Sequence, residues 1–357
     1  MTKQEIFAQF GLSDAVEILP FGEGHINDTF LVTAADGKQY VLQRINHVVF
    51  PHPEEVMENI FAVTHHIRKK ITAEGGDPTR QTLHYRKTKD GALCYFDGES
   101  YFRVYDFIDH AKTYQTVESP ELLRDAAMAF GLFQKRLADF PADKLHEVIP
   151  NFHHTPTRFA AFQEAVRQDV CGRAKDVQTE IAFALAREAD THVVTDAIRD
   201  GLVPLRVTHN DTKLNNILFD ETSGKACCVI DLDTVMPGSL LYDYGDALRF
   251  GASSAAEDEP DLRKVFFRLD CFSAYTEGFL SSMGDTLTKK EKELLPHSVK
   301  LLTFECGIRF LTDYLNGDTY FKIHRPNHNL DRCRTQFALV ADMERKMAQM
   351  EQIRDNA

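Results

Sequence analysis

The stretches RVTHNDTKLNNILFD (206–220) and CCVIDLD (227–233) decide how this chain folds. Each contains a short apolar run, at 217–219 and at 227–230, and turn-forming residues at 220–224 separate the two runs. Short apolar runs on either side of such a turn are typical of a β-hairpin. The two ends of a hairpin meet, so we expect the residues just before the first run to lie beside those just after the second.

Polar residues stand at both ends of the predicted hairpin: Asp211 and Asn216 before it, Asp231 and Asp233 after it. A lone Asp-x-Asp is usually a turn, but the whole combination, which includes His209-x-Asp211, is much rarer. Oxygen ligands suit Mg²⁺, which retains waters and shares substrate phosphates. The pattern is typical of kinase phosphoryl transfer, in which one Asp orients the nucleophile and an Asn and a second Asp hold the metal. We expect His209 to brace the loop.

The composition argues against several classes of protein. The chain has 357 residues, 43% hydrophobic and 27% charged, as in ordinary globular proteins. A net charge of −13 without a long basic run argues against a nucleic-acid partner. The seven cysteines are scattered and include no Cys-x-x-Cys, which favours reduced thiols over disulfides or a zinc site. No apolar run reaches membrane-spanning length and no apolar signal core begins the chain, so we expect a cytoplasmic protein without a membrane partner. We also expect a monomer.

The first 50 residues are expected to form a short helix and three strands. Thr2 and Glu5 fit a capping box for a helix that ends near residue 11. The first strand is expected at 16–20, the second ends at the Asp36-Gly37 hairpin turn, and the third is expected at 39–45. This favours a small antiparallel sheet at the start of the chain.

The loop between the first two strands contains Gly22-x-Gly24. Glycines there let the backbone approach a ligand closely, as in loops that cover nucleotide phosphates; a plain β-turn is the alternative. Asn27 and Thr29 would add side-chain donors near the phosphates. His25, at the loop tip, points either at a ligand or at water.

The third strand lacks the lysine with which kinases hold the phosphates. Arg44 occupies the matching position, whereas Gln43 faces the other way on an alternating strand. Either Arg44 replaces the lysine, or magnesium and loop amides hold the phosphates. In the next helix, expected at 54–70, Glu55 or Glu58 could pair with Arg44, but a solvated acidic face is the favoured interpretation.

The composition changes near residue 109. Before it we expect three more strands, and the backbone of the last, which contains Tyr105, would form a hinge that binds an adenine edge. These strands are expected at 82–88, 92–96 and 101–108. After it the chain is mostly helical, with helices expected at 120–139, 158–171, 177–199, 242–250, 262–280, 289–315 and 333–352. This predicts an N-terminal nucleotide-binding lobe, 1–108, and a C-terminal helical lobe, 109–357.

These motifs together resemble a known group of enzymes. The glycine-containing loop, His209-x-Asp211, Asn216 and Ile230-Asp231 look like the aminoglycoside phosphotransferase and choline kinase-like superfamily. The stretches MPGS (236–239) and ECGIRFL (305–311) narrow the resemblance to the N-acetylhexosamine 1-kinases, over nearly the whole chain. The resemblance implies an α+β, two-lobed protein-kinase-like fold: a small antiparallel β-sheet lobe with one helix, and a larger, mainly helical lobe.

The resemblance also implies ATP-dependent phosphorylation of the anomeric hydroxyl of N-acetylglucosamine or N-acetylgalactosamine, with Mg²⁺, in amino sugar salvage. Asp211 is then the catalytic carboxylate and Asn216 and Asp231 are magnesium ligands. Asp233 is a further candidate metal ligand in the same loop. Two alternatives are a kinase of another small alcohol, such as a different sugar, choline or an aminoglycoside, and an ATP-binding pseudokinase. The presence of all the motif residues disfavours the pseudokinase.

The sugar site is expected in the helical lobe. Arg309 lies among apolar neighbours in a predicted helix, where an unpaired buried arginine is costly, so it is the first candidate for contacting the sugar. An internal ion pair with Asp313 is the alternative. Tyr320 and His25 are weaker substrate candidates. Two carboxylates have expected structural roles: a brace for the magnesium loop (Asp246) and a helix cap (Asp243).

Overall fold

The computed structural model describes residues 1–22 and 26–357, and it divides into two compact units. Unit 1 comprises Met1–Thr113, Arg136–Pro150 and Asn216–Pro237, and unit 2 comprises Tyr114–Lys135, Asn151–Asn215 and Gly238–Ala357. The 217–230 hairpin therefore belongs to the same unit as the N-terminal sheet. The boundary expected at residue 109 between two lobes stays a prediction.

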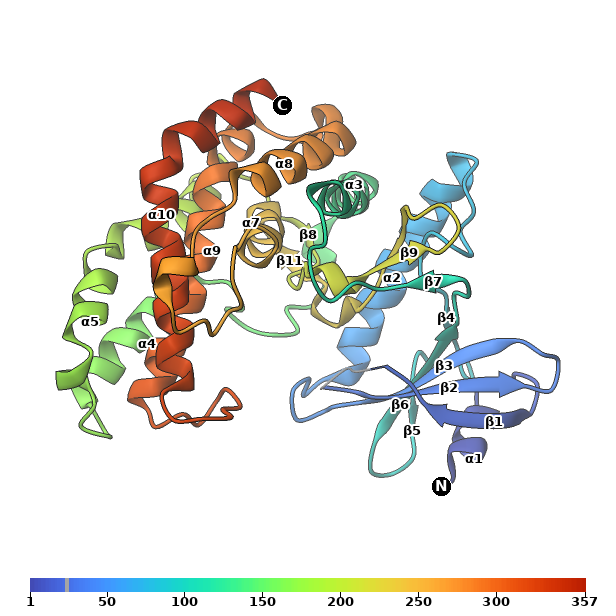
Figure 1. Cartoon of the computed structure of the whole chain (residues 1–357). Coiled ribbons are helices and arrows are strands. Elements are labelled where there is room, and N and C mark those ends of the chain that lie inside the picture. Colours follow the sequence, from blue (N-terminus) through green and yellow to red (C-terminus); the bar gives the residue numbers. More distant parts are fainter. Residues whose placement is uncertain (23–25) are drawn as a thin grey trace. The chain divides into compact units, whose positions relative to one another are not determined.

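Unit 1 is built on a six-stranded antiparallel sheet (Figure 1). Its order is β1-β2-β3-β6-β4, with β5 paired to β6. The strands are β1 (Ala15–Pro20), β2 (Asp28–Ala34), β3 (Gln39–Ile45), β4 (Tyr85–Arg86), β5 (Tyr95–Phe96) and β6 (Tyr101–Asp106). The antiparallel sheet predicted from the sequence is confirmed, although the strands expected at 82–88 and 92–96 contain only two residues each.

Two helices complete the N-terminal part of unit 1: α1 (Lys3–Ala8) and α2 (Pro53–Ala73). The predicted capping box is present, because Thr2 Oγ1 accepts the Glu5 N–H at 3.2 Å and the Glu5 carboxylate accepts the Thr2 N–H at 2.8 Å. Phe7 of α1 packs in one apolar cluster with Leu42 and Val104 of the sheet. Helix α2 buries an apolar stripe at the spacing that the sequence predicts.

The predicted hairpin is also present. Strand β9 (Ile217–Asp220) pairs antiparallel with β10 (Ala226–Val229), and β7 (Ala111–Lys112), which the sequence did not predict, pairs with the other edge of β9. The Asp220 carboxylate accepts the Ser223 N–H at 2.8 Å, an Asx-type bond that favours the turn. After β10 the chain forms a short 3₁₀ turn, η5 (Leu232–Thr234).

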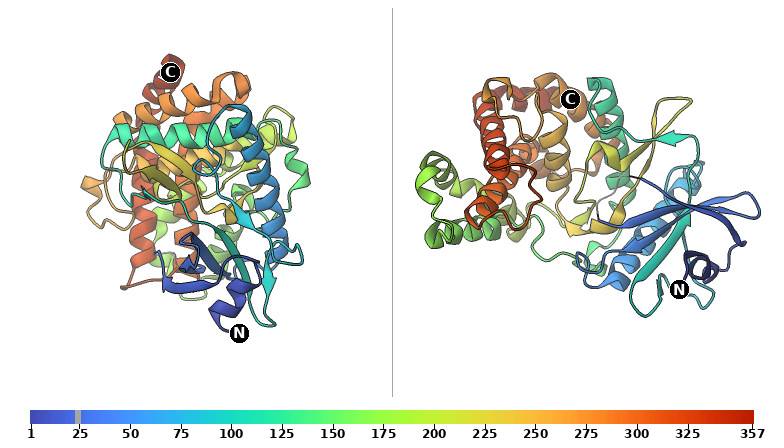
Figure 2. Two further views of the ribbon diagram at one scale, coloured as in Figure 1. Left: turned by 90° about the vertical axis from the view of Figure 1, so that its right-hand side faces the viewer. Right: turned by 60° about the horizontal axis from the view of Figure 1, so that its bottom comes forward.

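Unit 2 is mostly helical and is organised around α9 (Lys289–Leu315), whose bounds match the prediction (Figures 1 and 2). Helices α10 (His328–Asn356), α7 (Leu240–Gly251) and α4 (Thr155–Gln168) pack against it. Helix α7 approaches closely at Gly245, where an added Cβ would lie 2.5 Å from the Ser298 carbonyl oxygen. Its other helices and strand are α3 (Pro120–Arg136), α5 (Gln178–Leu185), α6 (Val193–Arg199), α8 (Leu269–Met283) and β8 (Arg206–Thr208), and the short strand β11 (Met236–Gly238) begins in unit 1. No helix in the described ranges is long and apolar enough to cross a membrane.

The continuous helix predicted at 177–199 is wrong. The chain forms α5, a 3₁₀ turn at Glu188–His192, and then α6. The hydroxyl of the buried Thr191 donates a hydrogen bond to the Glu188 carbonyl at 2.6 Å. Local side-chain bonds of this kind compete with the helical ladder.

The helix predicted at 262–280 begins too early. Only a 3₁₀ turn forms at Leu262–Lys264, and α8 starts at Leu269. The intervening backbone pairs with an earlier segment, since the Arg268 N–H donates to the Ala252 carbonyl at 2.9 Å. This long-range pairing overrides the local helical pattern.

Candidate active site

The loop that carries Asp211 follows β8 in unit 2, and α7 holds it. The buried carboxylate of Asp243 accepts the backbone N–H groups of His209 at 2.9 Å and Asn210 at 2.7 Å. Gln134 Nε2 donates a third hydrogen bond to it at 2.6 Å. Burial raises the pKa of Asp243, while these hydrogen bonds favour its charged form. The backbone immediately before Asp211 is therefore fixed by one buried carboxylate.

The helix-cap role expected for Asp243 is wrong, whereas the role expected for Asp246 as a brace of the magnesium loop stays a prediction. Ser239, and not Asp243, caps the helix, because its side chain accepts the Leu241 N–H at 3.3 Å. Asp246 pairs within α7, accepting from Arg249 Nε at 3.1 Å. The sequence placed Asp243 near a helix start but gave no sign of a partner more than 30 residues away.

His209 is fully buried and has the structural role that the sequence predicts for it. Its ring lies against Phe130 and Phe133, with centroids 5.6 and 6.0 Å away. Its Nδ1 accepts the backbone N–H of Asp211 at 3.2 Å. The imidazole thus stabilises the turn that leads into Asp211.

Asp211 itself is held in a half-buried position next to a strained residue. Its side chain is 27% exposed, and Oδ1 pairs with Lys213 Nζ at 2.7 Å. The preceding Asn210 has φ +65°, a left-handed conformation that is uncommon outside glycine and that clusters at functional sites. The carboxylate is therefore positioned rather than freely mobile, and a cation lies beside it.

In unit 1 the hairpin brings the two candidate metal ligands Asn216 and Asp231 together. The Ile230 N–H donates to the Asn216 carbonyl at 2.9 Å, so Asn216 lies opposite the residue that precedes Asp231. Asn216 is buried and Asp231 is exposed, with φ +58°. A left-handed residue costs roughly 1–2 kcal/mol, which the surrounding contacts must offset.

These donors fit Mg²⁺ better than a structural metal. In the described ranges, no group of three or more His, Cys, Asp or Glu side chains forms a metal site. Magnesium needs none, because it is held through one or two protein oxygens, water and substrate phosphates. Asn216 and Asp231 supply that kind of oxygen set.

The environment of Asp233 differs from that of Asp231. Asp233 is 4% exposed, its Oδ1 pairs with Arg103 Nη1, and its Oδ2 accepts from Asn27 Nδ2 at 2.6 Å. Although burial opposes the charge, the Asp233 carboxylate keeps the pKa of Arg103 above its ordinary value. Both carboxylate oxygens therefore already have protein partners. Sequence reasoning missed Arg103 because its partner lies 130 positions away.

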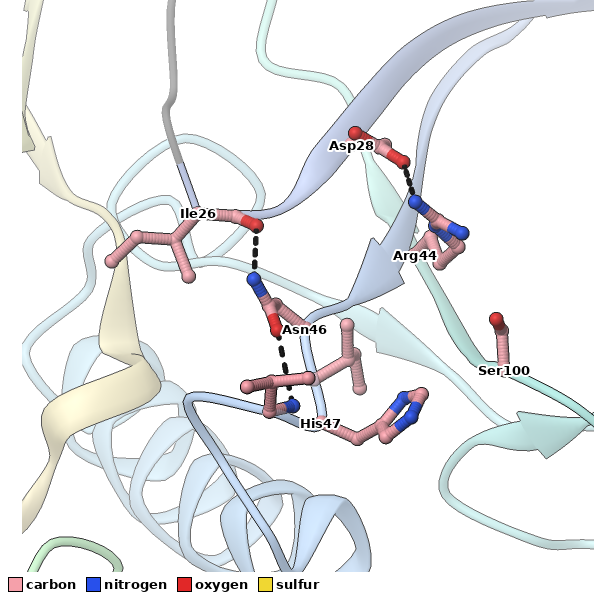
Figure 3. A pocket seen from close by; sticks show the side chains of 8 residues that line it. Ile26, Asp28, Arg44, Asn46, His47 and Ser100 are labelled. Atoms are coloured by element: carbon pink, nitrogen blue, oxygen red, sulfur yellow. Dashed lines mark hydrogen bonds and ion pairs between the residues drawn. The ribbon is translucent and has the colours of Figure 1, made fainter.

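Arg44 does not meet this buried network. It forms an exposed ion pair with Asp28 at 2.5 Å and lines a cavity of about 190 Å³ (Figure 3). Gln43, on the opposite face of β3, accepts from Arg103 Nε at 2.9 Å. Glu58, considered as a partner for Arg44, contacts His146. The cation on the Gln43 face is thus Arg103, from the neighbouring strand.

The other nucleotide-binding candidates lie around the same sheet. Gly22 has φ +79°, which glycine adopts readily. Thr29 Oγ1 accepts from Gln43 Nε2 at 3.0 Å. Tyr105 is half-buried, with its ring 5.0 Å from that of Tyr85. Two candidates lie outside the described residues: Gly24 and His25.

Arg309 of α9 is not paired with Asp313, the alternative considered from the sequence. Asp313 instead accepts the backbone N–H groups of Thr319, Tyr320 and Phe321, at 2.8–2.9 Å. The guanidinium of Arg309 lies over the Phe321 ring, 5.5 Å from its centroid. The Tyr320 side chain is 73% exposed.

A second arginine, missed in the sequence, lies near Arg309. Burial and the charge of Arg309 both lower the pKa of Arg158. Arg158 Nε is buried and has no hydrogen-bond partner among the described residues. Two like charges in one partly buried place are unfavourable unless they are compensated, and the single carboxylate of Glu305 acts on both arginines.

A buried ion pair connects this arginine cluster to the Asp211 loop. Glu305, one helical turn before Arg309, pairs with His153 Nδ1 at 3.0 Å, and His153 Nε2 faces the Asn210 carbonyl at 3.3 Å. Burial opposes charge on His153, but Glu305 outweighs it and raises the pKa of the imidazole. The protonated ring can donate from both nitrogens, to Glu305 and to the Asn210 carbonyl.

Comparison with known proteins identifies the family of this chain. Residues 17–278, well over half of the chain, match the sequence pattern of a family described as "Phosphotransferase enzyme family". The chain belongs to this phosphotransferase family. It is therefore a transferase of the kinase type, as the sequence predicts.

Solved structures show the same fold at low sequence identity. A microcompartment-associated aminopropanol kinase is 14% identical, with 98% of this chain and 97% of that chain covered and a TM-score of 0.65. An aminoglycoside phosphotransferase from Alicyclobacillus acidocaldarius is 15% identical, with 100% and 97% covered and a TM-score of 0.63. An amicoumacin kinase, solved with AMP-PNP and Ca²⁺, is 11% identical, with 97% and 94% covered and a TM-score of 0.58. The predicted α+β kinase-like fold is confirmed.

Proposed function

We propose that this phosphotransferase transfers the γ-phosphoryl group of ATP to the anomeric hydroxyl of N-acetylglucosamine or N-acetylgalactosamine. The family match supports the reaction class. The sequence stretches at 236–239 and 305–311 support the sugar, because they resemble N-acetylhexosamine 1-kinases. An adenine nucleotide with a divalent ion is supported by the amicoumacin kinase of the same fold, which was solved with AMP-PNP and Ca²⁺.

The observation that carries the proposal is the arginine cluster next to the Asp211 loop. Arg158 and Arg309 lie close enough for their charges to interact, and Glu305 and His153 connect them to Asn210. Guanidinium groups only donate hydrogen bonds, so they favour an acceptor rich in oxygen atoms. They repel a cationic acceptor. The cluster thus favours a neutral sugar over an amino alcohol or an aminoglycoside.

In the proposed reaction Asp211 orients the anomeric hydroxyl and accepts its proton as the bond to phosphorus forms. Asp243 keeps the loop in place, and Lys213 supplies positive charge beside the carboxylate. Asn216 and Asp231 would hold Mg²⁺, which offsets charge on the phosphate oxygens when bound. The glycine-containing loop near Gly22 would cover the phosphates. We give Asp233 a structural role because both of its oxygens are occupied.

The test is magnesium-dependent ADP release with N-acetylglucosamine, N-acetylgalactosamine, choline, 1-amino-2-propanol and an aminoglycoside. The same panel includes 1-deoxy-N-acetylglucosamine, which lacks the reacting hydroxyl. We expect turnover with the two acetylated sugars and none with the 1-deoxy analogue. Turnover with only a cationic acceptor would retain the phosphotransferase chemistry and reject the sugar assignment.

The role of the arginine cluster has its own test. Arg309→Ala is expected to weaken N-acetylglucosamine binding at least tenfold while leaving ATP binding within twofold, because charged hydrogen bonds contribute about 1.5–3 kcal/mol. A matched control is Arg199→Ala, an exposed surface arginine of the same unit that pairs with Asp196 and Asp200. Equal sugar affinity in Arg309→Ala and wild type would exclude Arg309 from the acceptor site.

A further inference from the structure

A row of hydrogen-bonded side chains crosses the unit 1 sheet. Thr29, Gln43 and Arg103 stand at directly paired positions of β2, β3 and β6. Gln43 Nε2 donates to Thr29 Oγ1 at 3.0 Å, and Gln43 Oε1 accepts from Arg103 Nε at 2.9 Å. Arg103 then donates to Asp233, at the end of the hairpin. The row links the strand after the glycine-containing loop to the turn after β10.

The contact between Arg103 and Asp233 is buried on both sides. Their side chains are 2% and 5% exposed. Arg103 also lies over the Tyr85 ring at 5.7 Å and contacts Met57 Sδ, so its orientation is fixed. Burying an ion pair adds little or no stability over apolar packing, because both charges lose water. Added stability therefore does not explain why the chain buries this ion pair, whereas fixing the geometry of the residues around it does.

The ion pair fixes the conformation of the η5 turn, which contains Asp233. Asp231, the residue before this turn, is in the left-handed region. Asp233, two residues later, receives Arg103 on one oxygen and Asn27 on the other. At the far end, Asn59 Nδ2 of α2 donates to the Val235 carbonyl at 2.9 Å. The sheet and α2 thus hold the turn at both ends.

Asn27 extends this arrangement toward the glycine-containing loop. Its Oδ1 accepts the Asn46 N–H at 2.9 Å while its Nδ2 contacts Asp233. Asn46 Nδ2 in turn donates to the Ile26 carbonyl at 3.2 Å (Figure 3). One carboxylate, Asp233, therefore joins the end of the glycine-containing loop to the turn that carries Asp231.

We propose that Arg103 is a positioning residue, whose ion pair with Asp233 holds Asp231 in the conformation that binds the metal–nucleotide complex. The inference rests on the proposed function, because it takes Asp231 as a metal ligand. On this account Arg103 acts through Asp233 and does not contact the nucleotide. Arg103 lies on β6, one strand away from β3, where a kinase lysine is expected. On this account it positions a carboxylate and does not bind a phosphate.

The test measures ADP affinity by calorimetry, with Mg²⁺ and with EDTA, in wild type, Arg103→Met and Asp233→Asn. The quantity of interest is the gain in ADP affinity that Mg²⁺ brings. Outer residues that orient metal ligands typically change metal affinity by 10–100-fold. We expect the gain to fall at least tenfold in both variants, while ADP affinity in EDTA stays within twofold of wild type.

The control is Arg80→Met, which breaks another arginine–aspartate pair, with Asp220 at the opposite end of the same hairpin. It is expected to retain the full gain. If Arg103→Met does not fold, Arg103→Lys, which keeps the charge but cannot bond to both Gln43 and Asp233 in the same way, is expected to show an intermediate gain.

Each other outcome overturns the inference in a recognisable way. A fall in ADP affinity in EDTA for Arg103→Met would mean that Arg103 binds phosphate directly. A full gain in folded Arg103→Met and Asp233→Asn would mean that the ion pair only supports packing. The absence of any gain in wild type would instead refute the proposed metal–nucleotide function itself.

Discussion

Replacing Asp243 by Asn tests whether one buried carboxylate fixes the loop of Asp211. In wild type, Oδ1 accepts the Asn210 N–H, and Oδ2 accepts the His209 N–H and Gln134 Nε2. An asparagine keeps only one acceptor oxygen and turns an NH₂ group toward at least one donor. The variant loses one charge-assisted bond in the best orientation and leaves a buried N–H without an acceptor. At about 1–3 kcal/mol for each effect, the expected loss of unfolding free energy is about 2–6 kcal/mol.

The assay is urea unfolding, followed by ADP-release kinetics with N-acetylglucosamine. Because a misplacement of about 1 Å can cost roughly 10²-fold in rate, we expect kcat to fall on the order of 100-fold with ATP affinity nearly unchanged. The control is Asp200→Asn, which removes an exposed partner of Arg199 and should change stability by less than about 1 kcal/mol. Equal stability and kcat in Asp243→Asn and wild type would refute the reasoning.

Two further perturbations test the packing and the charges of unit 2. Gly245→Ala places a Cβ 2.5 Å from the Ser298 carbonyl oxygen, and the overpacking should cost about 1–3 kcal/mol and lower the urea midpoint. The control, Gly251→Ala, meets only a flexible leucine side chain and should cost less. Equal midpoints for the two variants would contradict this. His153, whose pKa Glu305 raises above 6.5, should contribute stability that is complete below pH 6.5 and is lost as the pH rises through the higher folded-state value. In urea titrations at several pH values, His153→Gln should lack this loss, and an unchanged pH profile would exclude the charged pair.

The sequence predicted those features whose causes are local. The hairpin at 217–230 follows from two apolar runs around a turn, and its Asp220 bond is a property of four neighbouring residues. The capping box at Thr2 is equally local. The start of α9 follows from a second capping box, formed by Thr288 and Glu291. Local chemistry is sufficient for elements like these.

Features that depend on distant partners were not predictable in the same way. Asp243 has the spacing of a helix cap, but its partners lie in a loop more than 30 residues earlier. Arg44 has the expected position for a phosphate-binding cation, but the strand register places Arg103 on the face where Asp233 lies. The alternation of a strand tells which residues share a face and not what that face meets. Only the folded chain supplies that information.

The most direct test of the central claim is phosphoryl transfer from ATP to N-acetylglucosamine by wild type and Asp211→Asn, with the product followed by ³¹P NMR. Wild type should produce the sugar 1-phosphate in the presence of Mg²⁺. Asp211→Asn should produce none above background while it binds ATP within twofold of wild type. Substantial sugar 1-phosphate from Asp211→Asn would contradict the assignment of Asp211, and a wild-type product phosphorylated at another hydroxyl would contradict the proposed reaction.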